Sequence, residues 1–100
     1  MTSHHVPKEA RKEFKIVFQA RFSFGRDASD EYQTITYPYT GTLAGAKLKA
    51  SDLFKRRFET FCRRGDVNVD ISYEGKLVAS KTFWRGGSWA NSYLVRSLNL

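Results

Sequence analysis

The sequence predicts an α+β fold in which a mostly antiparallel, four-stranded sheet carries one amphipathic helix on one face. Three observations support this prediction. Residues 14–24 alternate between apolar and other side chains, residues 42–64 repeat apolar side chains at every third or fourth position, and residues 67–84 return to alternation. Alternation is typical of a strand with one buried face, and the longer repeat is typical of a helix that buries one stripe. The predicted order of elements is therefore ββαββ.

The first predicted strand is FKIVFQARFSF, residues 14–24. Its even positions are all apolar, whereas its odd positions include Lys15, Gln19 and Arg21. We therefore expect the even side chains to face the helix and these three to line the uncovered face of the sheet. GRDASDE supplies turn-forming residues, and YQTITY has the composition of a second strand that reaches as far as Pro38. Together these segments predict a first hairpin.

The predicted helix runs from Thr42 to Arg64. Thr40 or Thr42 can cap its first turn. Its end is indicated by Arg63 and Arg64, whose charges suit the negative end of the helix dipole, and by Gly65, which can adopt a left-handed conformation. We expect its apolar stripe to pack on the first strand and form a core with Phe14, Ile16, Phe18 and Phe22; the stripe consists of Leu43, Ala46, Ala50, Leu53, Phe54, Phe58 and Phe61.

The second predicted hairpin turns at Glu74-Gly75, and its register has two alternatives. A two-residue turn places Val78 and the alternate residues after it on the core face. A three-residue turn instead places Leu77, Ala79 and Phe83 there, together with Lys81. If the first strand lies beside the last, the strand arrangement is similar in topology to the β-grasp class.

The last segment, SWANSYLVRSLNL, predicts either a short helix or another strand, and its pattern slightly favours the helix. In a helix, one side would carry Ala90, Tyr93, Leu94 and Leu98.

The length of 100 residues suits a single domain, which we expect over residues 11–100. Residues 1–10 contain two adjacent histidines, a proline and no periodic pattern, so we expect a flexible basic N-terminal arm. The sequence lacks both a signal-peptide pattern and an apolar run of the roughly 18 residues that a membrane helix needs. Its single cysteine excludes an internal disulfide and fits a reducing compartment. These features favour a cytoplasmic protein with no membrane contact.

The formal net charge of +7 favours an anionic partner. The excess is concentrated in two regions. Residues 1–26 carry +4 and residues 47–64 carry +5, whereas residues 27–46 carry −3 and the remainder +1. On a helical wheel Lys49, Arg56 and Arg63 repeat at seven residues and share one stripe, and Asp52 and Glu59 lie between them.

Catalysis and metal binding find little support in the sequence. The only histidines are His4 and His5 in the predicted arm, so no Ser-His or Cys-His pair can be placed on a rigid element. The acidic group around Asp30 does not match the spacing of a calcium loop, and no glycine-rich phosphate loop is present. Cys62 is interpreted as a core residue. We therefore expect a non-enzymatic protein without a metal or another cofactor.

Nucleic-acid binding requires cations that reach successive phosphates and often aromatic faces on which bases stack. The predicted helix supplies the cations, and FWRGGSW places Trp84, Arg85 and Trp89 around two glycines. Arg57 projects toward the apolar side of the helix, so it must snorkel, pair with a carboxylate or lie at the edge of the core. The candidate nucleic-acid-binding residues are Lys49, Lys55, Arg56, Arg63, Arg64, Arg21, Trp84 and Arg85.

Two functions remain in competition. The first is a small nucleic-acid-binding protein that grips DNA or RNA phosphates with the basic helix face and the N-terminal arm, without sequence specificity, and with aromatic stacking if the ligand is single-stranded DNA or RNA. The second is a protein-binding inhibitor or adaptor, for example one encoded by a virus or mobile element, that uses the open sheet face or a strand edge. A homodimer is compatible with both, and it would double the phosphate contacts of the first.

Overall fold

The first strand, β1 (Lys12–Phe22), provides the centre of the core. A computed structural model of the chain describes residues 11–26, 28–84 and 87–100. The even-numbered side chains from Phe14 to Phe22 are buried as predicted, and the ring of Phe18 stacks on Phe58 of the helix with 4.5 Å between centroids. The strand ends at Phe22 rather than at Phe24, whose half-exposed ring packs against Phe22.

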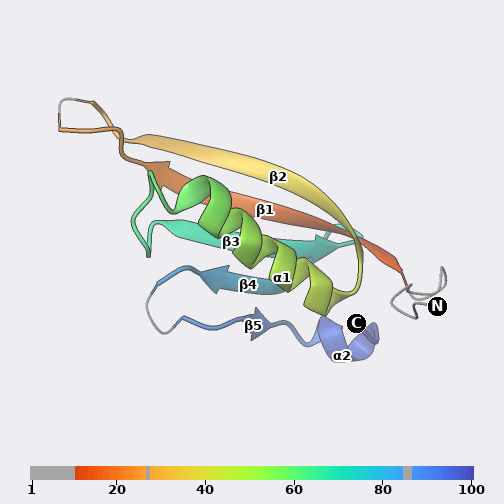
Figure 1. Cartoon of the computed structure of the whole chain (residues 1–100). Helices are drawn as coiled ribbons and strands as arrows, with labels where there is room; N and C mark the ends of the chain where they lie inside the picture. The colour runs from red at the N-terminus through yellow and green to blue at the C-terminus, as the bar shows by residue number, and fades with distance from the viewer. Residues whose placement is uncertain (1–10, 27, 85–86) are drawn as a thin grey trace.

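The other strands are β2 (Glu31–Gly41), β3 (Val67–Tyr73), β4 (Lys76–Thr82) and β5 (Ala90–Asn91). All five form one antiparallel sheet in the order β2-β1-β3-β4-β5 (Figure 1). The predicted α+β fold, a mostly antiparallel sheet with one main helix, is confirmed, and β5 adds a short fifth strand.

The predicted neighbour of β1 is wrong, because β1 lies beside β3 and not beside the last long strand, β4. The order therefore differs from the arrangement similar to the β-grasp class. The physical reason is burial: Val67, Val69 and Ile71 of β3 are completely buried, so this strand gains most from a place between two others. The tight hairpin that follows then places β4 on the outer side of β3.

The main helix consists of α1 (Leu43–Leu53), which continues without a break into one π-helical turn, η2 (Phe54–Phe58). It lies across one face of the sheet (Figure 1). The predicted cap is confirmed at Thr42, whose hydroxyl oxygen accepts a hydrogen bond of 3.1 Å from the Gly45 N–H. The predicted stripe is buried through the whole of α1, which fixes the opposite side of the helix as its outer surface.

The π-helical turn changes the end of the helix. The Glu59 N–H donates to the Phe54 carbonyl, five residues back, and the helix ends at Phe58 rather than at Arg64. The extra residue in the turn rotates the following side chains away from their predicted positions. Phe61 is 48% exposed, which corrects its predicted place in the core, whereas Cys62 is buried, as predicted.

The β3–β4 hairpin combines both predicted registers. Glu74 and Gly75 both have positive φ and form a two-residue turn between Tyr73 and Lys76. A β-bulge then shifts the register opposite Ile71, so that Val78 and Ala79 are both buried. From there the core face carries Ala79, Lys81 and Phe83, as the second alternative predicted.

The C-terminal segment contains a strand and a helix, because β5 is followed by the one-turn helix α2 (Leu94–Ser97). Leu94, Val95 and Leu100 pack against the core. Tyr93 is 80% exposed and Ala90 is also exposed, so their predicted positions on an apolar helix side are wrong. The predicted N-terminal arm, residues 1–10, lies outside the described residues.

Candidate nucleic-acid interface

The basic residues of segment 47–64 lie on the side of the sheet that the helix covers. We call their shared surface the helix layer: the outward side chains of α1 and η2 and of the turn that leads to β3. Of its seven basic side chains only Lys47 is partly buried, and the others are exposed: Lys49, Lys55, Arg56, Arg57, Arg63 and Arg64. Five of the predicted site residues therefore share one layer.

The predicted continuous stripe of Lys49, Arg56 and Arg63 is wrong in its geometry. Arg63 lies beyond the last helical residue, and the π-helical turn between Lys49 and Arg63 breaks the seven-residue repeat. The three side chains belong to the same layer, but they do not follow one line along a helix.

Two arginines of the helix layer form ion pairs with its two acidic residues. The Arg56 Nε lies 2.9 Å from Asp52 Oδ1, and the Arg64 Nη2 lies 2.8 Å from Glu59 Oε2. All four side chains are well exposed, so each pair contributes at most about 1 kcal/mol to folding. Each arginine uses only some of its five N–H donors in these pairs, and the others can reach a phosphate.

The remaining cations of the helix layer make no ion pair with a carboxylate of residues 11–26, 28–84 or 87–100, and two of them contact aromatic rings. The Arg57 guanidinium lies 6.0 Å from the ring centre of Tyr37 on β2, at the edge of the core, which is one of its three predicted alternatives. Lys47 Nζ donates to Asn91 Oδ1 at 2.6 Å and lies 5.9 Å from the ring centre of Trp89. Burial lowers the pKa of Lys47. Asn91 and Trp89 are more than 40 residues from Lys47, so no local sequence pattern could indicate these contacts.

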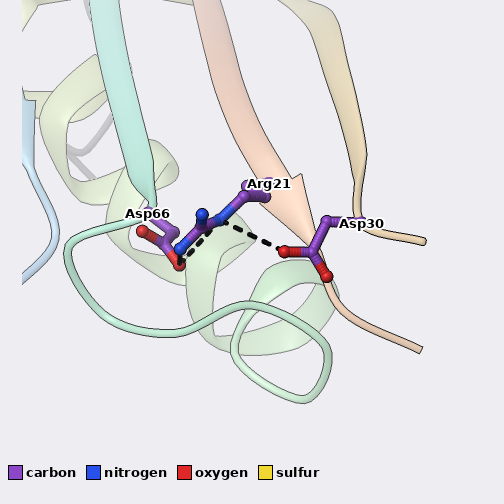
Figure 2. A network of polar contacts seen from close by, with 3 residues as sticks. All are labelled: Arg21, Asp30 and Asp66. Carbon is purple, nitrogen blue, oxygen red and sulfur yellow. Dashed lines mark hydrogen bonds and ion pairs between the residues drawn. The ribbon is translucent and has the colours of Figure 1, made fainter. Parts of the chain in front are cut away.

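Arg21 lies on the opposite, uncovered face of the sheet, apart from the helix layer. Its Nη2 lies 2.7 Å from Asp66 Oδ2, and its Nε lies 3.7 Å from Asp30 Oδ2 (Figure 2). These contacts join the end of β1 to the residues that precede β3 and β2. The hydrogen bond with Asp66, followed by one with Tyr32, raises the pKa of the guanidinium above its already high usual value. Arg21 therefore has structural partners of its own.

The open face around Arg21 carries polar groups in register across four strands. Thr34, Gln19, Asn68 and Thr82 are successive partners on β2, β1, β3 and β4, so hydroxyl and amide groups form one row. The Thr82 hydroxyl donates to the Asn68 side-chain oxygen. Two hollows of about 480 and 380 Å³ share Gln19 and Asn68 in their linings. Tyr32 lines the larger hollow, and Trp84 lines the smaller one.

Trp84 is 54% exposed and belongs to this open face. Trp89 is partly buried, with the ammonium groups of Lys47 and Lys81 within 6 Å of its ring centre. Arg85 lies outside the described residues. The structure thus separates the predicted site into two parts: the five helix-layer residues on one side of the sheet, with Arg21 and Trp84 on the other.

Cys62 is 7% exposed, and burial, followed by the charge of Asp66, raises the pKa of its thiol. Within the described part of the chain, no group of three or more histidine, cysteine or acidic side chains is arranged to hold a metal ion. None of the helices in that part is long and apolar enough to cross a membrane.

No protein-family model matches the chain, and the searches of curated proteins and of solved structures likewise found no match.

Proposed function

We propose that this protein is a non-enzymatic nucleic-acid-binding protein that contacts phosphates through the helix layer. The observation that supports this proposal is the concentration of charge. Residues 47–64 carry seven basic and two acidic side chains, and six of the basic ones are exposed on the same side of the sheet. A surface of this kind attracts a polyanion and can release the counterions that surround it.

The separation of Trp84 from the helix layer refines the proposal. Bases stacked on Trp84 would lie on the open face, whereas phosphates bound by Lys55 or Arg63 would lie on the other side of the sheet. Phosphate contact and stacking on this tryptophan therefore do not belong to one short binding site. We expect binding that depends on charge, with little dependence on sequence and no strong preference for single strands over a duplex.

The test is a fluorescence-anisotropy titration of the full chain with labelled oligonucleotides of unrelated sequence, both single-stranded and duplex, at several salt concentrations. The variant is Lys55→Gln with Arg63→Gln, because both side chains are exposed and neither forms an ion pair among the described residues. We expect weaker binding to every oligonucleotide and a slope of log affinity against log salt that is smaller by about one to two units.

The matched control is Lys15→Gln with Lys76→Gln, which removes the same charge from the open face and from the β3–β4 hairpin. We expect the control to retain most of the salt dependence. Equal losses of affinity and of salt slope in both double variants would mean that binding depends on the net charge of the protein and not on the position of its cations. Unchanged affinity and slope in the helix-layer variant would overturn the proposal.

A second candidate function, a protein-binding inhibitor or adaptor, is favoured by the open face. Tyr32 and Trp84 are 77% and 54% exposed there, around polar hollows, and aromatic side chains are enriched at protein interfaces. The two functions are separated by a pull-down from a lysate with and without nuclease. A stoichiometric protein that stays bound after nuclease treatment and is lost in a Tyr32→Ala, Trp84→Ala variant would support this second function.

A further inference from the structure

Strand β2 is a long edge of the sheet. It pairs with β1 along its full 11 residues, and the structure places none of the described strands against its other side. Figure 1 shows it as the outermost strand, beside β1. The opposite edge of the sheet is β5, which has only two residues. Among the described strands, β2 is therefore the one long edge, with a row of unpaired backbone N–H and C=O groups along its outer side.

The composition of this edge does not protect it well from pairing. Sheet edges are usually blocked by lysines, prolines, bulges or a short length. In a protein with a net charge of +7, β2 contains no lysine or arginine, and Glu31 is its only charged residue. Pro38 is its single blocking residue, because proline has no N–H to donate. Seven residues precede it, Glu31–Tyr37, and none of them is a proline, so those that alternate with the residues bonded to β1 direct an intact N–H and C=O toward the free edge.

We propose that β2 pairs antiparallel with β2 of a second copy, across a two-fold axis at Thr34. A symmetric ladder that uses Glu31–Tyr37 and excludes Pro38 has its centre at Thr34. In this register Thr34 faces its own copy, and Glu31 faces Tyr37 of the second copy. The two sheets become one sheet of ten strands, and the exposed edges of both copies are covered.

Charge complementarity supports the second copy as the occupant. The Arg57 guanidinium lies over the ring of Tyr37, on the side of the sheet that the helix covers. Glu31 lies on that same side, because its partner on β1 is Phe22, a core residue. In the proposed register each Glu31 therefore comes close to Arg57 of the other copy. The one charged residue of the edge thus meets an opposite charge, twice, by symmetry.

The pairing also has a geometric consequence for the helix layer. A two-fold axis that relates antiparallel neighbours in one sheet is perpendicular to that sheet, so both helices lie on the same face of the dimer. Two helix layers then form one basic surface on one side. The dimer itself does not depend on the proposed function, and it can be tested without nucleic acid.

The test is sedimentation equilibrium of the nucleic-acid-free full chain over a wide range of protein concentration. We expect reversible dimerisation, with a limiting mass of twice the 11.5 kDa of the chain. Thr34→Lys places two lysines opposite each other at the axis and is expected to weaken the dimer by up to about fivefold. The matched control is Thr40→Lys, an equally exposed position on β2 beyond Pro38, and it should leave the dimer unchanged.

The proposed pairing can be tested in two further ways if Thr34→Lys alone destabilises the fold. A mixture of Thr34→Lys and Thr34→Glu chains should form a mixed dimer, because the two side chains at the axis then attract each other. The exchange Glu31→Arg with Arg57→Glu should restore a dimer that each single change weakens. The inference is overturned if the chain stays monomeric at every concentration. It is also overturned if the dimer affinity is the same in the unchanged chain, in Thr34→Lys and in the mixture.

Discussion

The two faces of the sheet carry similar side chains in different arrangements. On the open face Arg21 is held between Asp66 and Asp30, among hydroxyl and amide groups. On the helix layer the ion pairs are local ones, such as Arg56 with Asp52, and positive charge remains in excess. A cation that is fixed by a partner distant in the sequence, as Arg21 is by Asp66, organises the fold. A cation that is exposed beside similar charges is available to a ligand.

This comparison explains why net charge alone gave an incomplete prediction. The sequence included both Arg21 and Lys55 among the candidate nucleic-acid-binding residues, because both are basic and both belong to positively charged segments, although it placed Arg21 on the uncovered face of the sheet. The structure places them on opposite sides of the sheet. The partner of a charged side chain and the layer on which it lies therefore decide its role more than the charge of its segment does.

The largest expected effect concerns the contact that joins the sheet to the helix. Phe18 is completely buried and stacks on Phe58, so Phe18→Ala removes the ring that connects the centre of the sheet to the helix. We expect a loss of about 3 to 5 kcal/mol in the free energy of unfolding, measured by urea denaturation. The control Phe24→Ala, at a half-exposed ring, should cost less than about 1 kcal/mol. Similar losses at both positions would contradict the assignment of the core.

A smaller effect is expected on the open face. Arg21→Gln removes the contacts with Asp66 and Asp30, so we expect a lower urea midpoint than in Arg96→Gln, which alters an exposed residue of α2. The pair is partly exposed, so the difference should shrink in high salt. The same variant should leave the salt dependence of oligonucleotide binding unchanged. If the salt slope falls by about one unit, Arg21 contacts a phosphate. The distinction between a structural cation on the open face and ligand-binding cations on the helix layer would then be wrong.

The smallest effect concerns Cys62, which lies four residues after the end of the π-helical turn. Because Cys62 is buried and the pKa of its thiol is raised, less thiolate is present at neutral pH than in the unfolded chain. We expect slow alkylation by iodoacetamide in the native protein, with the rise in rate shifted to higher pH than in the urea-unfolded chain. Equal rates at neutral pH in the native and unfolded chains would contradict the burial of Cys62.

Much of the fold was predictable because its strongest patterns are local. The alternation from Phe14 to Phe22 identified the core face of β1, and the composition around Thr42 identified the helix cap. The bulge at Val78 was not predictable, because Val78 and Ala79 are both apolar and either can fill the core. The strand order depends on which strand gains most from burial between two neighbours, and this comparison involves the whole sheet.

The candidate site was less predictable for the same reason. Nothing near Arg21 in the sequence indicates Asp66, which is 45 residues away and reaches it only through the pairing of β1 with β3. The π-helical turn was also hidden, because Phe58, Phe61 and Cys62 fit an apolar stripe with or without an extra residue. Predictions from periodicity fail where one inserted residue changes which side chains share a face.

The most direct test of the account is a map of backbone amide shifts, by heteronuclear NMR of the labelled full chain, as a short oligonucleotide is added. The account predicts that the shifted signals belong to the helix layer, from Lys49 through Lys55 to Arg63. It predicts that the signals of Gln19 and Asn68 on the open face stay in place. Shifts concentrated on Gln19, Asn68 and Trp84, with none on the helix layer, would contradict the proposed binding surface.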